Sequence, residues 1–351
     1  MDKNAGLRVV KCRWEAKVEK FRQSMKFHKD VSVVERIFSL ILGSCCKDVK
    51  KHFQNDVAGA ERIKSIIEIY VQKNVPIPVT ITFALYMRAK NSFKFSESHK
   101  NFPHLGWADF LCRLKYLNEK VKTFYQPGIR IFIFEEASLF YPVLNWRRED
   151  VDAFEVVVKN IIISIDMTDM LEIIPMGDMN FPTWDDWRQG ITFEYASEHA
   201  INDSVVFAMM TSCEEFTDRC LMDCLYSQNV CDYEMIKSLY QSLWQIAYLK
   251  ASYVRHVMDM RKSQNLWGKY VKEYYHAMGI DVNEHDFLDG VITHKPGRLS
   301  LDMGMVLPNH GMMILDGKGH RIEPEYRLQD TKALPVKASS SGKEFIFFYQ
   351  T

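Results

Sequence analysis

The sequence lacks an excess of charge of either sign. Lys and Arg together number 45 and Asp and Glu together number 45, so the formal net charge of the 351 residues is zero. Binding to nucleic acid needs a clustered basic surface that neutralises several phosphates. The basic residues of this chain are dispersed along its length. We therefore expect no nucleic-acid partner.

Long hydrophobic runs are also missing. The apolar run 156–165 is interrupted by Lys159 and Asn160 and is too short to cross a bilayer core of about 30 Å. The first five residues have no basic flank leading into an apolar stretch, as a signal peptide would. These features predict a cytoplasmic protein with no membrane partner.

The familiar metal and nucleotide motifs are not present. Cys220 and Cys224 are four residues apart, but no second pair and no suitably spaced histidine completes a zinc set. The eight scattered cysteines are interpreted as reduced, mostly buried thiols. No Gly-x-Gly-x-x-Gly or Gly-Lys-Ser/Thr loop follows a candidate strand, which disfavours nicotinamide and P-loop enzymes. We expect no metal.

Helical and strand patterns alternate in the first half of the chain. Residues 6–72 predict helices. The β-branched segment 79–85, introduced by Pro76 and Pro78, predicts a buried strand. Segment 107–124 places its apolar residues on one helical face, and segment 129–134 follows as a second buried strand. Strand, helix and strand in this order predict a parallel βαβ unit.

The rest of the chain extends this pattern. Segment 150–163 predicts a helix, and segment 171–176 predicts a strand. Residues 191–276 are expected to be mainly helical. The remaining residues show β patterns, and residues 339–342 are expected to form a flexible surface loop. We predict one compact α/β domain with a Rossmann-like, mostly parallel sheet flanked by helices. Its parts are an N-terminal helical part at 1–72, the βαβ core at 73–190, a helical insertion at 191–278 and a C-terminal β-rich part at 279–351.

Ionisable side chains follow the predicted strands, where open α/β sheets bind ligands. Arg88 and Lys90 follow the first strand, and they are either phosphate clamps or solvated loop charges. Glu135 and Glu136 end the second strand. One of these carboxylates is expected to face solvent; if both entered a dry cleft, one would hold its proton. Asp109 is interpreted as a charge that stabilises a helix start.

A second set of polar groups lies near the C-terminus, in Arg298-Leu299-Ser300-Leu301-Asp302 and in Pro308-Asn309-His310-Gly311. Arg298 is either an anion-binding group or the ion-pair partner of Asp302 on the same strand face. His310 is either a proton carrier or a hydrogen-bonded structural group. The residues alone leave these alternatives open.

The order of several segments resembles the isocyanide synthases, the pyoverdine/dityrosine biosynthesis family, over roughly residues 60–320. The resemblance rests on two groups of segments. The first comprises the strand at Pro76-Ile77-Pro78 with its following loop, the helix start Leu105-Gly106-Trp107-Ala108-Asp109 and the turn Tyr125-Gln126-Pro127-Gly128. The second comprises Arg298-Leu299-Ser300 and the later His310. The order and spacing of these segments fit the family, and their amino acids match the family's motifs in part.

Residue by residue, the matches and departures are specific. Arg88 stands where the family has a loop lysine, Asn91 matches the loop asparagine, and Asp109 stands for a glutamate. Glu136, Ala137 and Ser138 replace the family's Asp-Gly-Arg turn, which is the main departure. Arg298, Ser300 and His310 are kept, Asp302 replaces a histidine, and Arg261 matches an arginine on a late helix.

The resemblance implies a transferase of secondary metabolism that joins an amino acid amine to the carbonyl carbon of ribulose 5-phosphate and releases an isonitrile. It implies no cofactor beyond that co-substrate, and an iron- and 2-oxoglutarate-dependent oxygenase as pathway partner. Glu136, His310 and Asp302 are the expected catalytic residues. The expected substrate- and phosphate-binding residues are Arg88, Lys90, Asn91, Arg261, Arg298 and Ser300. The alternatives are a catalytically altered family member that binds a small molecule, and a related enzyme with another reaction on an amino acid or sugar phosphate.

Overall fold

The computed structural model describes residues 5–24, 31–45, 50, 53, 55–83, 105–140, 148–179, 181, 253, 256–257, 259–291, 299–300, 311–316, 319–324, 334–340 and 343–349. The chain divides into two compact units. The first comprises Met1–Ser138, Arg147–Asp178 and Tyr270–Thr351, and the second Leu139–Trp146 and Met179–Lys269. Most of the second unit lies outside the described residues, so the single-domain arrangement stays a prediction.

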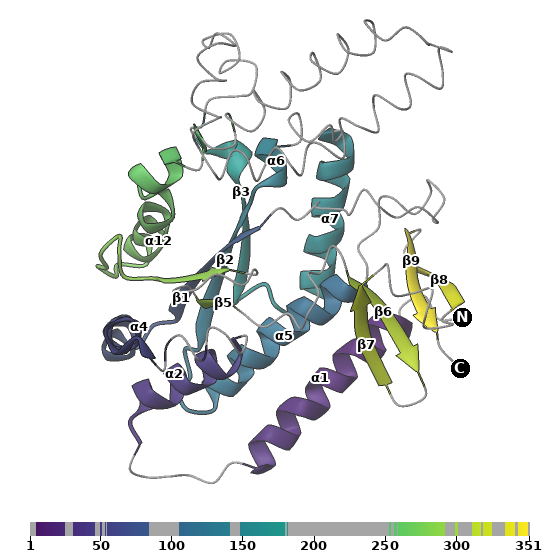
Figure 1. Cartoon of the computed structure of the whole chain (residues 1–351), viewed down its shortest axis with the longest axis horizontal. Helices are drawn as coiled ribbons and strands as arrows, with labels where there is room; N and C mark the ends of the chain where they lie inside the picture. Colours follow the sequence, from purple (N-terminus) through teal and green to yellow (C-terminus); the bar gives the residue numbers. More distant parts are fainter. Residues whose placement is uncertain are drawn as a thin grey trace, which may run out of the picture. The chain divides into compact units, whose positions relative to one another are not determined.

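The first unit is built around a five-stranded sheet whose paired strands all run parallel, in the order β3-β2-β1-β4-β5 (Figure 1). The predicted α/β fold with a parallel βαβ core is therefore confirmed. The strands are β1 (Ile77–Phe83), β2 (Ile129–Glu135), β3 (Leu171–Pro175), β4 (Leu288–Val291) and β5 (Leu299–Ser300).

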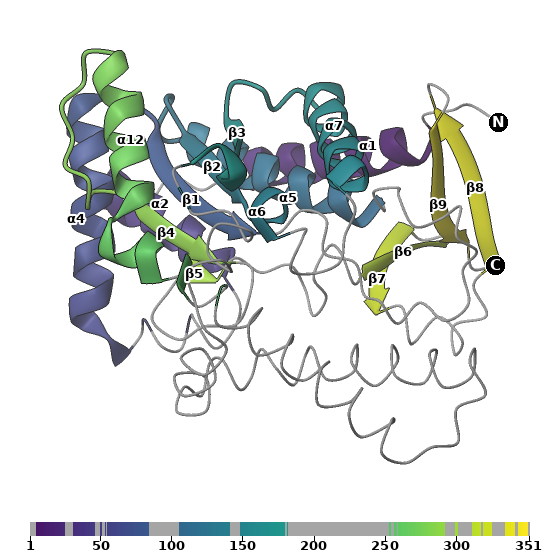
Figure 2. The ribbon, with the colours of Figure 1, turned by 90° about the horizontal axis from the view of Figure 1, so that it is seen from above.

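Helices cover both faces of this sheet. Helices α5 (Leu105–Lys122) and α7 (Arg148–Ser164) lie on one face, and α4 (Val57–Lys73) and α12 (Leu266–Ala277) lie on the other (Figures 1 and 2). The rings of Phe132 and Phe134 both contact Tyr270 of α12, with ring centres 5.9 and 5.7 Å apart. Since side chains alternate along a strand, the even-numbered residues of β2 face α12.

Local chemistry sets where the helices begin and end. Helix α2 (Val33–Gly43) begins after Ser32, whose hydroxyl accepts the N–H of Glu35, and α4 begins after Asp56, whose carboxylate accepts the N–H of Gly59. Helix α4 ends at Asn74 in the left-handed conformation. None of the helices within the described ranges is long and apolar enough to cross a membrane.

The connection from α5 to β2 is fixed by Asn118 and Gly128. The buried Asn118 accepts the N–H of Ile129 at 2.8 Å, and its amide nitrogen lies 3.3 Å from the sulfur of Met170. Gly128 has a φ of 72°, and a Cβ there would lie 2.3 Å from Oδ1 of Asn118. Glycine adopts this conformation without strain, so Gly128 allows the turn at residues 125–128 that leads into β2.

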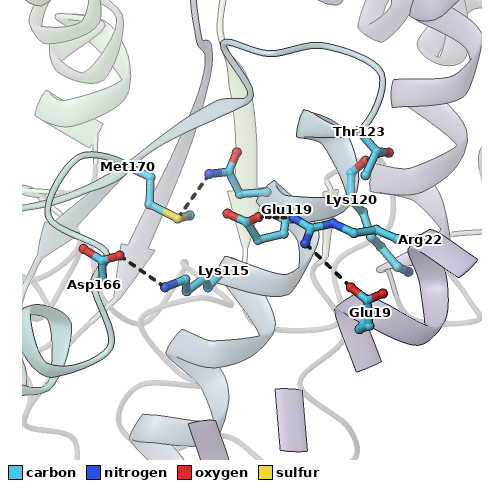
Figure 3. Close-up of polar contacts among 9 residues, drawn as sticks. Glu19, Arg22, Lys115, Glu119, Lys120, Thr123, Asp166 and Met170 are labelled. Carbon is cyan, nitrogen blue, oxygen red and sulfur yellow. Dashed lines mark hydrogen bonds and ion pairs between the residues drawn. The ribbon is translucent and has the colours of Figure 1, made fainter. Parts of the chain in front are cut away.

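Helix α1 (Ala5–Ser24) packs along α5. Arg22 of α1 forms an ion pair with Glu119 of α5 at 3.0 Å, and Lys115 of α5 approaches Asp166 at 3.8 Å (Figure 3). These pairs are largely exposed, so each contributes at most about 1 kcal/mol. The buried apolar face of α5, predicted from its spacing, is the main source of packing energy. It consists of Phe110, Leu111, Leu114, Leu117 and Val121.

Tyrosine hydroxyls secure the amino-terminal end of β1. The hydroxyl oxygen of Tyr125 lies 2.8 and 2.6 Å from the backbone carbonyl oxygens of Tyr70 and Val75, which share its one hydrogen. Tyr275 of α12 donates to the carbonyl of Pro76. Burial raises the pKa of Tyr125 to about 12, so its hydroxyl stays protonated as a donor at neutral pH. The side-chain bonds that fix β1 are thus found at its start.

The C-terminal residues form a separate four-stranded sheet in the order β7-β6-β9-β8. Its strands are β6 (Gly311–Asp316), β7 (Gly319–Pro324), β8 (Leu334–Ser340) and β9 (Lys343–Tyr349). The predicted flexible loop at 339–342 is wrong at its start, because Ser339 and Ser340 pair with Glu344 and Lys343. Small polar residues suggested a loop, and antiparallel pairing close to a hairpin turn overrides that preference.

Candidate functional site

The strand order of the parallel sheet defines one topological switch point. From β1 the chain adds β2 and then β3 on one side, while β4 and β5 lie on the other. Open α/β sheets bind ligands outside the carboxyl ends of the strands at such a point. We use the name carboxyl edge for the last residues of the five strands. They are Phe83, Glu135, Pro175, Val291 and Ser300.

The register of the strands brings these ends together. Phe83 pairs with Glu135, Glu135 pairs with Pro175, and Val291 pairs with Ser300. Two predicted site residues therefore share this edge. Ser300 ends β5, and Glu136 directly follows β2 at a partly exposed position. The prediction that Glu136 lies at a strand end is confirmed, and its chemical role stays a prediction.

Six of the predicted site residues lie outside the described residues. They are Arg88, Lys90, Asn91, Arg298, Asp302 and His310. Their roles stay predictions. Arg261 belongs to the second unit, where its guanidinium carbon lies 5.5 Å from the ring centre of Trp267. That contact is a stacking interaction between a cation and an indole ring.

Glu135 and Glu136 differ sharply in burial. Glu135 is 1% exposed, and its Oε2 accepts the backbone N–H of Ser138 at 2.9 Å. The neighbouring Glu136 is partly exposed. Sequence reasoning assigned the candidate role to Glu136, and the structure adds that Glu135 supports the turn on which Glu136 is carried.

Ser138 connects that turn to the next strand end. Its hydroxyl donates to the carbonyl oxygen of Glu135 at 3.1 Å and accepts the N–H of Gly177 at 3.0 Å. A Cβ on Gly177 would lie 3.1 Å from the carbonyl oxygen of Ser138, so the close approach of the two turns favours glycine. Ser138 thus joins the end of β2 to the segment after β3.

Asp109 has a different role from the predicted one. It is the fifth residue of α5, the first turn of that helix contains no acid, and the side chain is fully buried. Its carboxylate accepts the indole N–H of Trp14 at 2.8 Å and the Nε–H of Arg113 at 3.0 Å. The prediction of a helix-start charge is wrong, because a partner 95 residues away in α1 holds this carboxylate in the core.

The described cysteines agree in part with the expectation of buried thiols. Cys45 and Cys112 are buried, whereas Cys12 is exposed. Burial raises the pKa of Cys112 to about 12, so its thiol is protonated and unreactive at neutral pH. Within the described ranges, no group of three or more His, Cys, Asp or Glu side chains is placed to hold a metal ion.

Two polar groups that sequence reasoning missed lie on the central strand. The hydroxyls of Thr80 and Thr82 in β1 are buried and have no hydrogen-bond partner. In the sequence, threonine within an apolar run signals only β-propensity, so no local pattern distinguishes these two residues from other strand residues.

Comparison with known proteins reveals a structural similarity. No family model matches the chain, and no curated protein matches it. Among solved structures, the crystal structure of the PvcA protein from Pseudomonas aeruginosa is similar, with a TM-score of 0.58 and 13% sequence identity. The similarity covers 91% of this chain and 100% of the PvcA chain. At this identity the similarity establishes a shared fold.

Proposed function

We propose that this chain is an isocyanide-synthase-like enzyme that joins the amine of an amino acid to the carbonyl carbon of ribulose 5-phosphate and releases an isonitrile. One observation carries the proposal: motif segments from three distant parts of the sequence accompany three strands, β1, β2 and β5, of one parallel sheet. Arg88 follows β1 by five positions in the sequence, Glu136 directly follows β2, and Arg298 directly precedes β5. The α/β fold expected from the resemblance supports the proposal, as does its similarity to PvcA.

The residue types of these segments suit the reaction. A sugar phosphate and an amino acid carboxylate both need cationic donors, and arginine binds such groups with two parallel hydrogen bonds. Condensation at a carbonyl carbon releases water, and conversion of that carbon into an isonitrile breaks its bonds to both neighbouring sugar carbons, which leave as separate fragments. These steps need a group that accepts and returns protons. Glu136 is partly buried directly after a strand, so we assign it this proton transfer together with His310.

The test is incubation of the purified chain with ribulose 5-phosphate and a panel of amino acids, followed by mass analysis and chemical trapping of isonitriles. We expect an isonitrile from the wild-type chain and a large loss of product with Glu136→Gln, which keeps the size of the side chain. Absence of product with every amino acid would contradict the proposal. Consumption of ribulose 5-phosphate without an isonitrile would instead identify a related enzyme.

A second candidate is a small-molecule binding protein whose ancestral chemistry has ended. The observation that favours it is Ser138, which stands in place of the arginine of the Asp-Gly-Arg turn and whose hydroxyl bonds to Glu135 and Gly177. A calorimetric titration separates the two candidates. A binding protein would take up ribulose 5-phosphate or an amino acid stoichiometrically, with no product detected after long incubation.

A further inference from the structure

Thr80 and Thr82 place two unpartnered hydroxyls inside the central strand of the sheet. Thr80 is 0% exposed, and Oγ1 of each residue is covered without any hydrogen-bond partner. Strands buried on both faces in a parallel sheet are normally apolar. A buried hydroxyl without a partner destabilises the folded state, because it loses its bonds to water. Two such groups in line on one strand therefore need an explanation.

Strand register shows which face the two hydroxyls occupy. Thr80 pairs with Phe132 and Thr82 with Phe134, and both phenylalanine rings contact Tyr270 of α12. Register partners in a parallel pair point to the same face, so both threonines lie on the α12 face. Thr82 is the last residue but one of β1, and Thr80 lies one pleat deeper, about 7 Å further from the carboxyl edge.

The strand on the other side of the switch point adds a polar group to the same face. Asp289 of β4 pairs with Thr80, so both residues belong to one face of the sheet. The neighbouring strands β1 and β4 therefore carry hydroxyl and carboxylate groups on one face beside the switch point. This patch consists of Thr80, Thr82 and Asp289.

We propose that this patch binds the hydroxyl groups of a polyhydroxylated small molecule, with Thr82 as the residue that contacts the ligand. A threonine hydroxyl both donates and accepts, which matches a neutral sugar hydroxyl, and a carboxylate accepts hydrogen bonds from sugar hydroxyls. The ligand's hydroxyl supplies the partner that Thr82 lacks. That this ligand is the sugar portion of ribulose 5-phosphate rests on the proposed function.

Substitution of Thr82 by valine tests the proposal, because valine keeps the branched shape and removes the hydroxyl. Thr82→Val removes a buried group without a partner, so we expect a thermal midpoint about 1–3 °C higher than that of the wild-type chain. The same variant lacks a bond to the ligand, so we expect its Kd for ribulose 5-phosphate, measured by calorimetry, to rise about tenfold. Thr80→Val should also raise the midpoint and should change the Kd less.

The matched control is Thr123→Val near the end of α5. Its hydroxyl already donates to the carbonyl of Lys120 at 2.6 Å. Loss of that bond should lower the midpoint and leave the Kd unchanged. This pattern is the reverse of the pattern expected for Thr82→Val.

The possible results separate this inference from the proposed function. A more stable Thr82→Val variant with weakened binding supports the patch. Equal binding by Thr82→Val and the wild-type chain overturns the patch alone, as does a lowered midpoint, which would show that the hydroxyl has a structural role. If the wild-type chain fails to bind ribulose 5-phosphate, the proposed function is overturned, and the sugar assignment is overturned with it.

Discussion

Substitution of Glu135 should mainly lower stability, whereas substitution of its neighbour Glu136 should mainly lower the reaction rate. Glu135→Ala removes a carboxylate that is 1% exposed and accepts the N–H of Ser138 at 2.9 Å. The loss of this acceptor from the N–H of Ser138 costs about 1–3 kcal/mol, and the lost buried methylene adds about 0.8 kcal/mol. We expect Glu135→Ala to lower the free energy of unfolding by about 2–3 kcal/mol.

Glu135→Gln is a milder change than Glu135→Ala, because glutamine keeps the size of the side chain. The amide oxygen still accepts the N–H of Ser138, so we expect a smaller loss of about 1 kcal/mol. Glu136→Gln keeps the size of a partly exposed side chain, and we expect a loss of less than about 1 kcal/mol. If Glu136 transfers protons in the reaction, Glu136→Gln should slow turnover about 10²- to 10⁴-fold.

Urea unfolding gives the stabilities, and isonitrile formation by the folded variants gives the rates. The expected result is that Glu135→Gln remains far more active than Glu136→Gln although it is the less stable of the two. Full activity of Glu136→Gln would refute the assignment of the proton transfer. A Glu135→Ala variant as stable as the wild-type chain would refute the structural role of that carboxylate.

Three further predictions concern the structure that supports the site. Gly128→Ala should cost about 1–3 kcal/mol in urea unfolding, since its φ is 72° and a Cβ would meet Asn118; equal stability would show that the turn relaxes freely. Asp109→Ala should cost about 2–4 kcal/mol, because it leaves the indole N–H of Trp14 without its acceptor in the core, and Trp14→Phe should cost less. The folded-state pKa of Cys112 is about 12, above its ordinary value of 9.0, so its contribution to stability is present below pH 9 and is lost as the pH rises towards 12. Cys112→Ala should flatten the decline in stability over that range, and an unchanged slope would contradict the assigned pKa.

The β1–α5–β2 unit was predictable because its hydrophobic pattern is strong and local. Nearly every residue of β2 is buried, and five apolar residues of α5 share one buried face. Strand β4 was not predicted, because Asp289 and Gly290 interrupt its short apolar segment. Its pairing with β1 on one side and β5 on the other stabilises it, and such pairing between distant segments leaves no local signal.

The positions of candidate site residues were predictable only where those residues directly follow a predicted strand. The place of Glu136 after β2 comes from the hydrophobic pattern. The roles of residues such as Arg298 and His310 come only from the family resemblance, and they stay predictions. The buried contact between Asp109 and Trp14 joins residues 95 positions apart, which no local pattern could indicate. The paired hydroxyls of Thr80 and Thr82 became visible only once the sheet register assigned them to one face.

Isotope labelling tests the central claim most directly. Ribulose 5-phosphate carrying ¹³C at its carbonyl carbon is incubated with the wild-type chain and the amino acid that gives product, and the isonitrile is analysed by mass spectrometry. If the amine nitrogen bonds to that carbon, the isonitrile carbon carries the label and the product is heavier by the mass of one neutron. An unlabelled isonitrile, or no isonitrile with any amino acid, would contradict the account.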